Sequence, residues 1–167
     1  MNGAANAKGS RLARLSRTCN HLTELVLLPF TFAFVAIIFF AVLTRFIFHY
    51  PIVESVELAR LAFVWTIMLA CAIGVYRQAH VAIFNFRDCL PLAWRLRVYR
   101  MVYLLCAGFG ALMLWYGIQL SVRVWHSSFP TLGWSQSWLY IPLAISGALI
   151  VLHGVSHALA PEEFHQP

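Results

Sequence analysis

The stretch Leu25–Thr44, LVLLPFTFAFVAIIFFAVLT, decides the fold of this chain, because it contains no charged residue. Three further apolar runs follow, at Leu61–Tyr76, Met101–Val122 and Val124–Ala160. A helix needs about 20 apolar residues to cross the hydrocarbon core of a bilayer, which is about 30 Å thick. The second run is shorter, and it reaches this length if the arginines at its two ends extend toward the headgroups. The sequence therefore predicts an all-α integral membrane protein with four transmembrane helices.

The composition leaves little room for anything besides a membrane domain. Charged residues make up 11% of the chain and the mean hydropathy is +0.75, whereas about a quarter of a typical soluble domain is charged. We therefore expect a single four-span membrane domain over residues 1–167. Residues 1–20 would form a basic cytoplasmic tail, and the spans would cover about residues 22–48, 61–77, 100–122 and 137–159.

The positive charges predict the orientation in the membrane. Of the twelve Lys and Arg residues, nine precede the first span or lie between the second and third. The other three are Arg45, Arg60 and Arg123. Because Lys and Arg concentrate on the cytoplasmic side, both termini are predicted to be cytoplasmic. The excess of positive charge on the cytoplasmic side, in a chain of net charge +6, favours anionic lipids, which we expect as partners. This distribution argues against binding of nucleic acid.

Short amphipathic interfacial helices are expected at both membrane surfaces. The segment Pro51–Arg60 begins with a proline and has acidic residues in its first turn, which both favour a helix start. On the cytoplasmic side, Phe86–Arg100 has a basic and an apolar face, compatible with an interfacial helix or a solvated loop. The connection Arg123–Ser137 interleaves aromatic and turn residues, which is typical of an interfacial hairpin. Residues 1–17 are expected to be disordered and to become helical at the membrane surface.

The spans lack the ionisable residues that an ion pathway requires. Every Asp, Glu, Lys and Arg lies at a span end or in a loop, and Glu24 sits within one turn of the predicted inner boundary. Proteins that move ions or protons usually place such groups inside the membrane. A free-standing small antiporter with four helices would need a deeper carboxylate. The sequence therefore favours a helper subunit over a pump, and we predict that it is not an enzyme.

The histidines raise the question of a haem or a metal. His49 and His80 would lie on opposite sides of the membrane, so they cannot share an iron. His153 and His157 are spaced i, i+4 on one helix face, which suits a metal or two separate ligands, but histidines near a span end commonly meet headgroups or a helix C-terminus. The four cysteines have no metal-type spacing. We predict no cofactor and no metal, and a haem- or quinone-linked membrane anchor of an oxidoreductase stays open as the alternative function.

Two features of the spans concern packing. Pairs of small residues four positions apart allow helices to approach closely. They are Ala107/Ala111, Ala144/Ala148 and Gly154/Ala158. Phenylalanines surround the first span on all sides, and a helix that is apolar all round contacts lipid or another membrane protein.

The pattern of local motifs resembles a known family. Arg45 closes the first span, and the stretch from Glu57 to Trp65 reads ELARLAFVW. The segment Arg77–Val81 reads RQAHV. These features resemble the small membrane component of tripartite ATP-independent periplasmic (TRAP) transporters, the DctQ-like family, with its Glu-Leu-x-Arg-x-x-Phe-x-Trp and Arg-x-x-His-Ile/Val patterns. The resemblance covers nearly the whole chain and is most specific between Arg45 and Val81.

The sequence departs from the family at two places. Cys71 stands where the family often has glycine, and Phe84-Asn85 replaces the acidic residue that follows the histidine. The second change argues against a role for a cytoplasmic carboxylate there.

The resemblance implies a function. The chain would be a non-catalytic small permease subunit of a secondary, ion-driven symport system for organic acids in the bacterial inner membrane. Its partners would be a large, elevator-type membrane subunit, which carries the substrate and sodium sites, and a periplasmic substrate-binding protein. The small subunit would extend the fixed part of the large one as a scaffold and help to dock the periplasmic protein.

The resemblance also nominates partner-contact residues. Those expected to contact the large subunit are Arg45, Trp65, Arg77 and His80. Those expected to position the periplasmic protein or the large subunit are Glu54, Glu57 and Arg60. For all of them, anchoring of a span end at the membrane surface is the competing role.

Overall fold

The computed structural model describes residues 3–47, 49, 52–77 and 92–159, and within them it is helical without a strand. The elements are α1 (Gly3–Ile47), α2 (Glu54–Tyr76), α4 (Leu92–Arg123), the short 3-10 helix η1 (Gln136–Leu139) and α5 (Ile141–Leu159). Four helical stretches are long and apolar enough to span a membrane: Arg14–Ile47, Glu54–Tyr76, Arg100–Arg123 and Gln136–Ala158. The predicted all-α, four-helix membrane fold is therefore confirmed.

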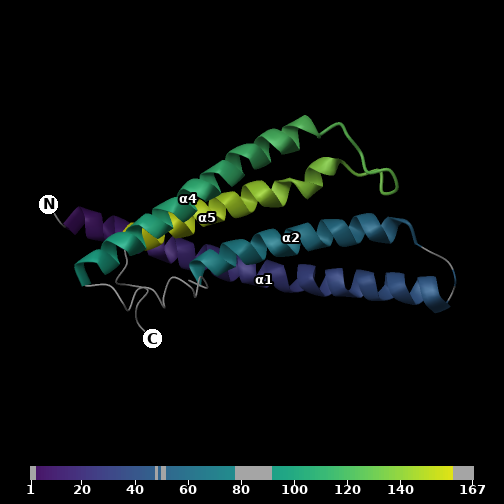
Figure 1. Cartoon of the computed structure of the whole chain (residues 1–167), viewed down its shortest axis with the longest axis horizontal. Helices are drawn as coiled ribbons and strands as arrows, with labels where there is room; N and C mark the ends of the chain where they lie inside the picture. The colour runs from purple at the N-terminus through teal and green to yellow at the C-terminus, as the bar shows by residue number, and fades with distance from the viewer. Residues whose placement is uncertain (1–2, 48, 50–51, 78–91, 160–167) are drawn as a thin grey trace.

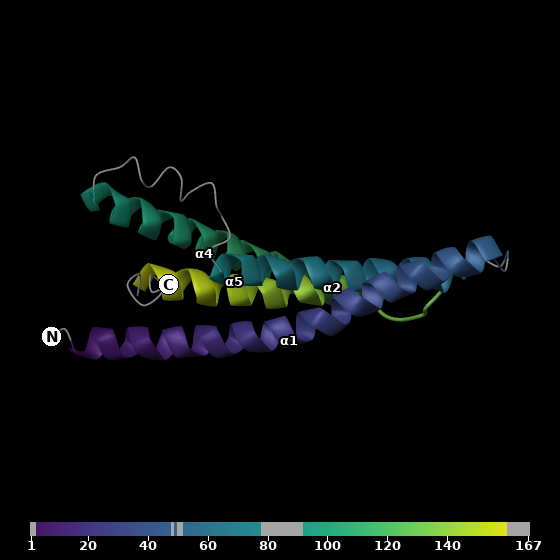
Figure 2. The ribbon, with the colours of Figure 1, turned by 90° about the horizontal axis from the view of Figure 1, so that it is seen from below.

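The helices form two antiparallel pairs that share one long axis. Helix α1 packs against α2, α4 packs against α5, and the two pairs meet where α2 and α1 contact α5 (Figures 1 and 2). Helix α1 contains Pro29, and Figure 2 shows that this long helix is not straight, as expected when a proline removes a backbone hydrogen bond. Helix α1 begins and α5 ends at the same end of the bundle. Following the predicted orientation, we refer to it as the inner end and to the opposite one as the outer end.

The tightest contact joins α4 and α5, and it depends on glycines. A Cβ atom added at Gly147 would lie 2.5 Å from the Leu114 backbone nitrogen, and one added at Gly117 would lie 2.7 Å from the Ala144 nitrogen. Gly154 lies in the same way against the backbone of Tyr103, at 2.9 Å. In a membrane the hydrophobic effect does not drive helices together, so such close backbone approach supplies the van der Waals contact that does.

The start of α1 differs from the expectation. Helix α1 begins at Gly3, so residues 3–17 are helical where disorder was expected. Alanine, leucine and arginine favour helix, and a segment that continues an existing helix bears no nucleation cost. The short helix expected within Pro51–Arg60, leading into the second span, corresponds to the first turns of α2, which runs unbroken from Glu54 to Tyr76. In the basic segment, α4 is likewise continuous from Leu92, and the residues before it lie outside the described part of the chain.

The connection between α4 and α5 is a hairpin, as expected. Ser128 and Ser135 form an antiparallel bridge, and the Phe129 backbone N–H donates to the Trp134 carbonyl at 2.8 Å. At the tip, Gly133 adopts a φ of 67°, a left-handed conformation that glycine accepts without strain, and its N–H donates to the Phe129 carbonyl. We call residues 124–135 the outer hairpin.

Candidate functional site

The outer hairpin is fixed to α2 by Glu57. The Glu57 carboxylate accepts hydrogen bonds from the backbone N–H of Leu132 at 3.0 Å and from that of Thr131 at 3.3 Å. These two donors lie next to each other at the hairpin tip, so one side chain holds the loop against the first turns of the helix. Glu57, which the sequence nominated as a partner contact, is thus occupied within the chain.

A second link to α2 is made by Trp65. Its indole N–H donates to the carbonyl of Trp138 in η1 at 3.0 Å. The Trp65 ring stacks face to face on the ring of Phe30 of α1, with centroids 5.1 Å apart and planes 7° apart. The ring of Phe63 contacts that of Phe34, also of α1, with centroids 5.4 Å apart. The Glu-Leu-x-Arg-x-x-Phe-x-Trp stretch therefore joins α1, α2 and η1.

Three nominated residues remain exposed at the outer end. Arg45 lies in the last turn of α1, Glu54 in the first turn of α2, and Arg60 six residues further along α2. None of the three takes part in an ion pair among the described residues. Their side chains are free to meet another protein or the membrane surface.

At the inner end, Arg77 ties α2 to α1. Its Nη2 lies 2.8 Å from Glu24 Oε1, and its Nε donates to the same oxygen at 2.9 Å. Asn20 donates to that oxygen from one turn away, at 2.8 Å. The Arg77 side chain is 64% exposed and that of Glu24 28% exposed, so the pair lies at the surface of the bundle. His80, the remaining nominated residue, lies outside the described residues.

The two histidines of α5 lie near the inner end of that helix, but they do not face headgroups. His157 is in the last turn of α5, as expected for a histidine at a helix C-terminus, and both His153 and His157 are fully buried between the helices. Ser16 Oγ lies 2.7 Å from His153 Nδ1, and His157 Nε2 donates to the Tyr76 carbonyl at 3.1 Å. The ring of Tyr103 on α4 stacks on His157, with centroids 4.8 Å apart. This buried polar cluster connects all four helices at the inner end.

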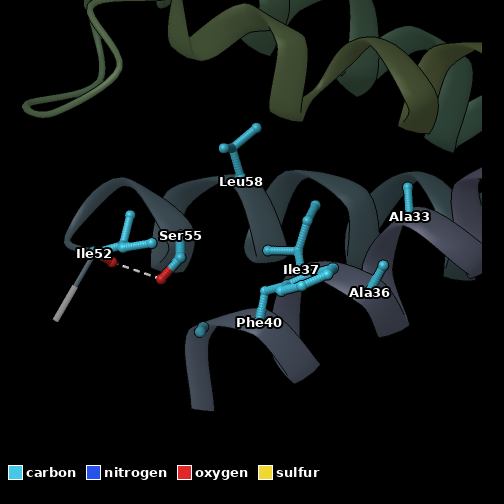
Figure 3. A pocket seen from close by; sticks show the side chains of 8 residues that line it. Ala33, Ala36, Ile37, Phe40, Ile52, Ser55 and Leu58 are labelled. Atoms are coloured by element: carbon cyan, nitrogen blue, oxygen red, sulfur yellow. Dashed lines mark hydrogen bonds between the residues drawn. The ribbon is translucent and has the colours of Figure 1, made fainter. Parts of the chain in front are cut away.

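The polar contacts described above join the helices to one another. Among the described residues, no group of three or more His, Cys, Asp or Glu side chains is placed to hold a metal. A groove of about 330 Å³ opens between α1 and the start of α2 (Figure 3), lined by Ala33, Ala36, Ile37, Phe40, Ala41, Ile52, Ser55 and Leu58. Its one hydroxyl, on Ser55, already donates to the Ile52 carbonyl at 2.6 Å. An organic anion would find no charged or free polar partner in this groove.

Comparison with known proteins agrees with this picture. The model of the family described as "Tripartite ATP-independent periplasmic transporters, DctQ component" matches residues 13–161. The sialic acid TRAP transporter small permease protein SiaQ of Vibrio cholerae serotype O1 is 32% identical over 141 residues, covering 84% of this chain and 81% of that protein. The sialic acid TRAP transporter permease protein SiaT of Haemophilus influenzae is 29% identical over 114 residues, which are 66% of this chain but 18% of that longer protein. These relatives are permeases and not enzymes.

Proposed function

Since the chain belongs to the DctQ family of TRAP transporters and is a small permease subunit, we propose that it works as a fixed, non-conducting scaffold for the large membrane subunit. Because the chain belongs to this family and has four helices that can span a membrane, it is a multi-pass protein of the bacterial inner membrane. The haem- or quinone-linked anchor that the sequence left open is replaced by this assignment. No catalytic role is attached to the chain.

The observation that carries the scaffold proposal is the way polar groups are used within the bundle. At the inner end, Ser16 of α1 bonds to His153 of α5, His157 bonds to the Tyr76 carbonyl of α2, and Glu24 bonds to Arg77. At the outer end, Glu57 and Trp65 hold the hairpin and η1. Groups that are committed to such contacts stiffen the bundle and leave no chain of ionisable residues through it. A stiff support is what a large subunit with a sliding domain requires.

The outer end supports a second role, in docking the periplasmic substrate-binding protein. If the termini are cytoplasmic, the outer hairpin and the exposed Arg45, Glu54 and Arg60 face the periplasm. Two cations and one anion on adjacent helix ends can orient an approaching protein, although exposed charges contribute more to the rate of encounter than to affinity. The fixed hairpin adds a shaped surface beside them.

The names of the relatives point to the solute and the partner. Both are named for sialic acid transport, so we propose that the complex carries sialic acid or a related acidic sugar, bound on other subunits and driven by an ion gradient. In the Haemophilus influenzae protein, the stretch similar to this chain is a small part of a much longer permease. This supports a large permease as the partner of the present chain.

Co-purification tests the proposal. The chain, tagged at one terminus and expressed with a large TRAP permease of the same organism, is expected to bring that permease through detergent extraction in a constant ratio. Uptake of sialic acid by cells should require both chains and the periplasmic protein. If the large permease never accompanies the tagged chain, or if uptake is unchanged without the chain, the scaffold proposal is wrong.

A further inference from the structure

Helix α4 presents a long, exposed face on the side opposite to α5. The residues buried toward α5 are Tyr103, Ala107, Gly110 and Gly117. About half a helical turn away lies a stripe at i, i+3, i+4 spacing. Its exposed members are Met101, Leu104, Leu105, Gly108, Leu112, Trp115, Tyr116, Gln119 and Val122. We call this stripe the outward face of α4.

Three members of this face carry hydrogen-bonding groups at membrane depth. Helix α4 crosses the membrane between Arg100 and Arg123. At a rise of about 1.5 Å per residue, Gln119, Tyr116 and Trp115 lie about 6, 10 and 12 Å below Arg123 along the axis. A hydrocarbon core about 30 Å thick therefore surrounds all three. Trp115 is 63% exposed and Tyr116 58% exposed.

Lipid is a poor neighbour for these groups. Within the described residues, the Gln119 amide, the Tyr116 hydroxyl and the Trp115 indole N–H make no hydrogen bond. Acyl chains offer no acceptor or donor, and polar groups left unpaired in hydrocarbon are strongly disfavoured. Tryptophan and tyrosine normally sit at the interface, where one end of the ring meets water.

Helix α1 provides the contrast. Between Leu25 and Thr44 its exposed side chains are hydrocarbon except that of Thr31, and the hydroxyls of Thr31 and of the half-buried Thr44 are satisfied by their own helix. Thr31 donates to the Leu27 carbonyl and Thr44 to the Phe40 carbonyl, each at 2.9 Å. Exposed residues such as Phe32, at 77%, need only acyl chains around them. The outer half of α1 is therefore suited to lipid, whereas the outward face of α4 requires protein.

We infer that the outward face of α4, centred on Trp115 and Gln119, is the surface on which the large membrane subunit packs. The inference rests on the proposed function, and it deepens that function by naming the contact. Gly108 lies on the same face with open space where a side chain would be, so a partner helix can approach closely there. The large permease is favoured over a second copy of this chain, because in the Haemophilus influenzae relative a similar segment is covalently part of a longer permease.

Photo-crosslinking in the intact complex tests the contact. A benzoylphenylalanine placed at Trp115 or at Gln119 is expected to form an adduct with the large subunit, and one placed at Phe32 is expected to form none. Adducts from Phe32 alone, or α4 adducts that contain only two copies of this chain or only lipid, would overturn the inference. If the two subunits do not co-purify at all, it is the proposed function that fails. If they co-purify without any α4 adduct, only the present inference fails.

A pair of glycine variants gives a second test. Both Gly108 and Gly74 have open space at the Cβ position, so they form a matched pair for substitution by leucine. Gly108→Leu is expected to reduce the amount of large subunit recovered by about tenfold or more, whereas Gly74→Leu leaves it unchanged. Equal recovery with both variants, each shown to keep the wild-type melting temperature as an isolated subunit, would contradict the contact.

Discussion

Replacing Gly147 by alanine tests the packing of α4 on α5 most sharply. An added Cβ would lie 2.5 Å from the Leu114 nitrogen, 2.7 Å from the Gly110 oxygen and 3.0 Å from the Leu114 Cα. All three neighbours are backbone atoms, so no side chain can rotate out of the way. Carbon atoms rest about 3.5–4.0 Å apart, and the two helices must therefore separate by roughly 1 Å at this crossing.

The expected loss combines two opposing effects. Overpacking a tight interface costs about 1–3 kcal/mol, and contact with rigid backbone belongs at the upper end of that range. Alanine gains about 1 kcal/mol over glycine in helix propensity. Gly147→Ala should therefore destabilise the subunit by about 2 kcal/mol. Gly108→Ala, in open space on the outward face of α4, experiences only the favourable effect and should stabilise by up to about 1 kcal/mol.

The assay is reversible unfolding of the purified subunit in mild detergent, followed by circular dichroism and by tryptophan fluorescence. The two alanine variants should differ in free energy of unfolding by about 3 kcal/mol. Because both gain the same helix propensity, this difference reports the overpacking at Gly147 alone. We expect opposite shifts in the unfolding midpoint. If Gly147→Ala were as stable as Gly108→Ala, the close contact of α4 and α5 would be refuted.

Three further outcomes are expected. Glu57→Lys should speed hydrogen exchange of the amides at the tip of the outer hairpin and lower uptake without loss of assembly. Glu54→Lys makes the same charge change without a hairpin contact, so it should leave that hydrogen exchange unchanged. In a double-mutant cycle, Arg77→Gln and Glu24→Gln should couple by less than about 1 kcal/mol, because the arginine is largely exposed; a much larger coupling would contradict the surface placement. His153→Leu should destabilise the isolated subunit by about 1–3 kcal/mol through the bond lost to a buried serine, and adding Ser16→Ala should restore part of this in the same unfolding assay.

The number and placement of the helices could be predicted from the sequence, because a bilayer imposes a minimum length on every uncharged run. The stretch Leu25–Thr44 and the run Met101–Val122 both meet it, and both lie within single helices. The outer hairpin was also predictable, since Pro130 and Gly133 stand among aromatic residues that favour the interface. Small residues signalled the α4–α5 contact only in part: Ala107, Ala144 and Gly154 lie in it, while Ala111 and Ala148 are exposed.

The roles of the polar residues could not be predicted with the same success. His153 and His157 were expected to meet headgroups or a helix C-terminus because they lie near the inner end of the last span, and their burial was not foreseen. Their spacing with Ser146 and Ile150, at i, i+4, i+7 and i+11, was the available signal of a buried face. The internal bonds of Trp65 and Glu57 join residues more than 70 positions apart. No local pattern carries information about contacts of that range.

Reconstitution of the purified subunit into liposomes tests the central claim, that these four helices support a transporter and conduct nothing. With an imposed ion gradient, vesicles that hold this chain alone should accumulate no sialic acid, and vesicles that also hold the large permease, supplied with the periplasmic binding protein, should do so. Accumulation by the chain alone would contradict the account.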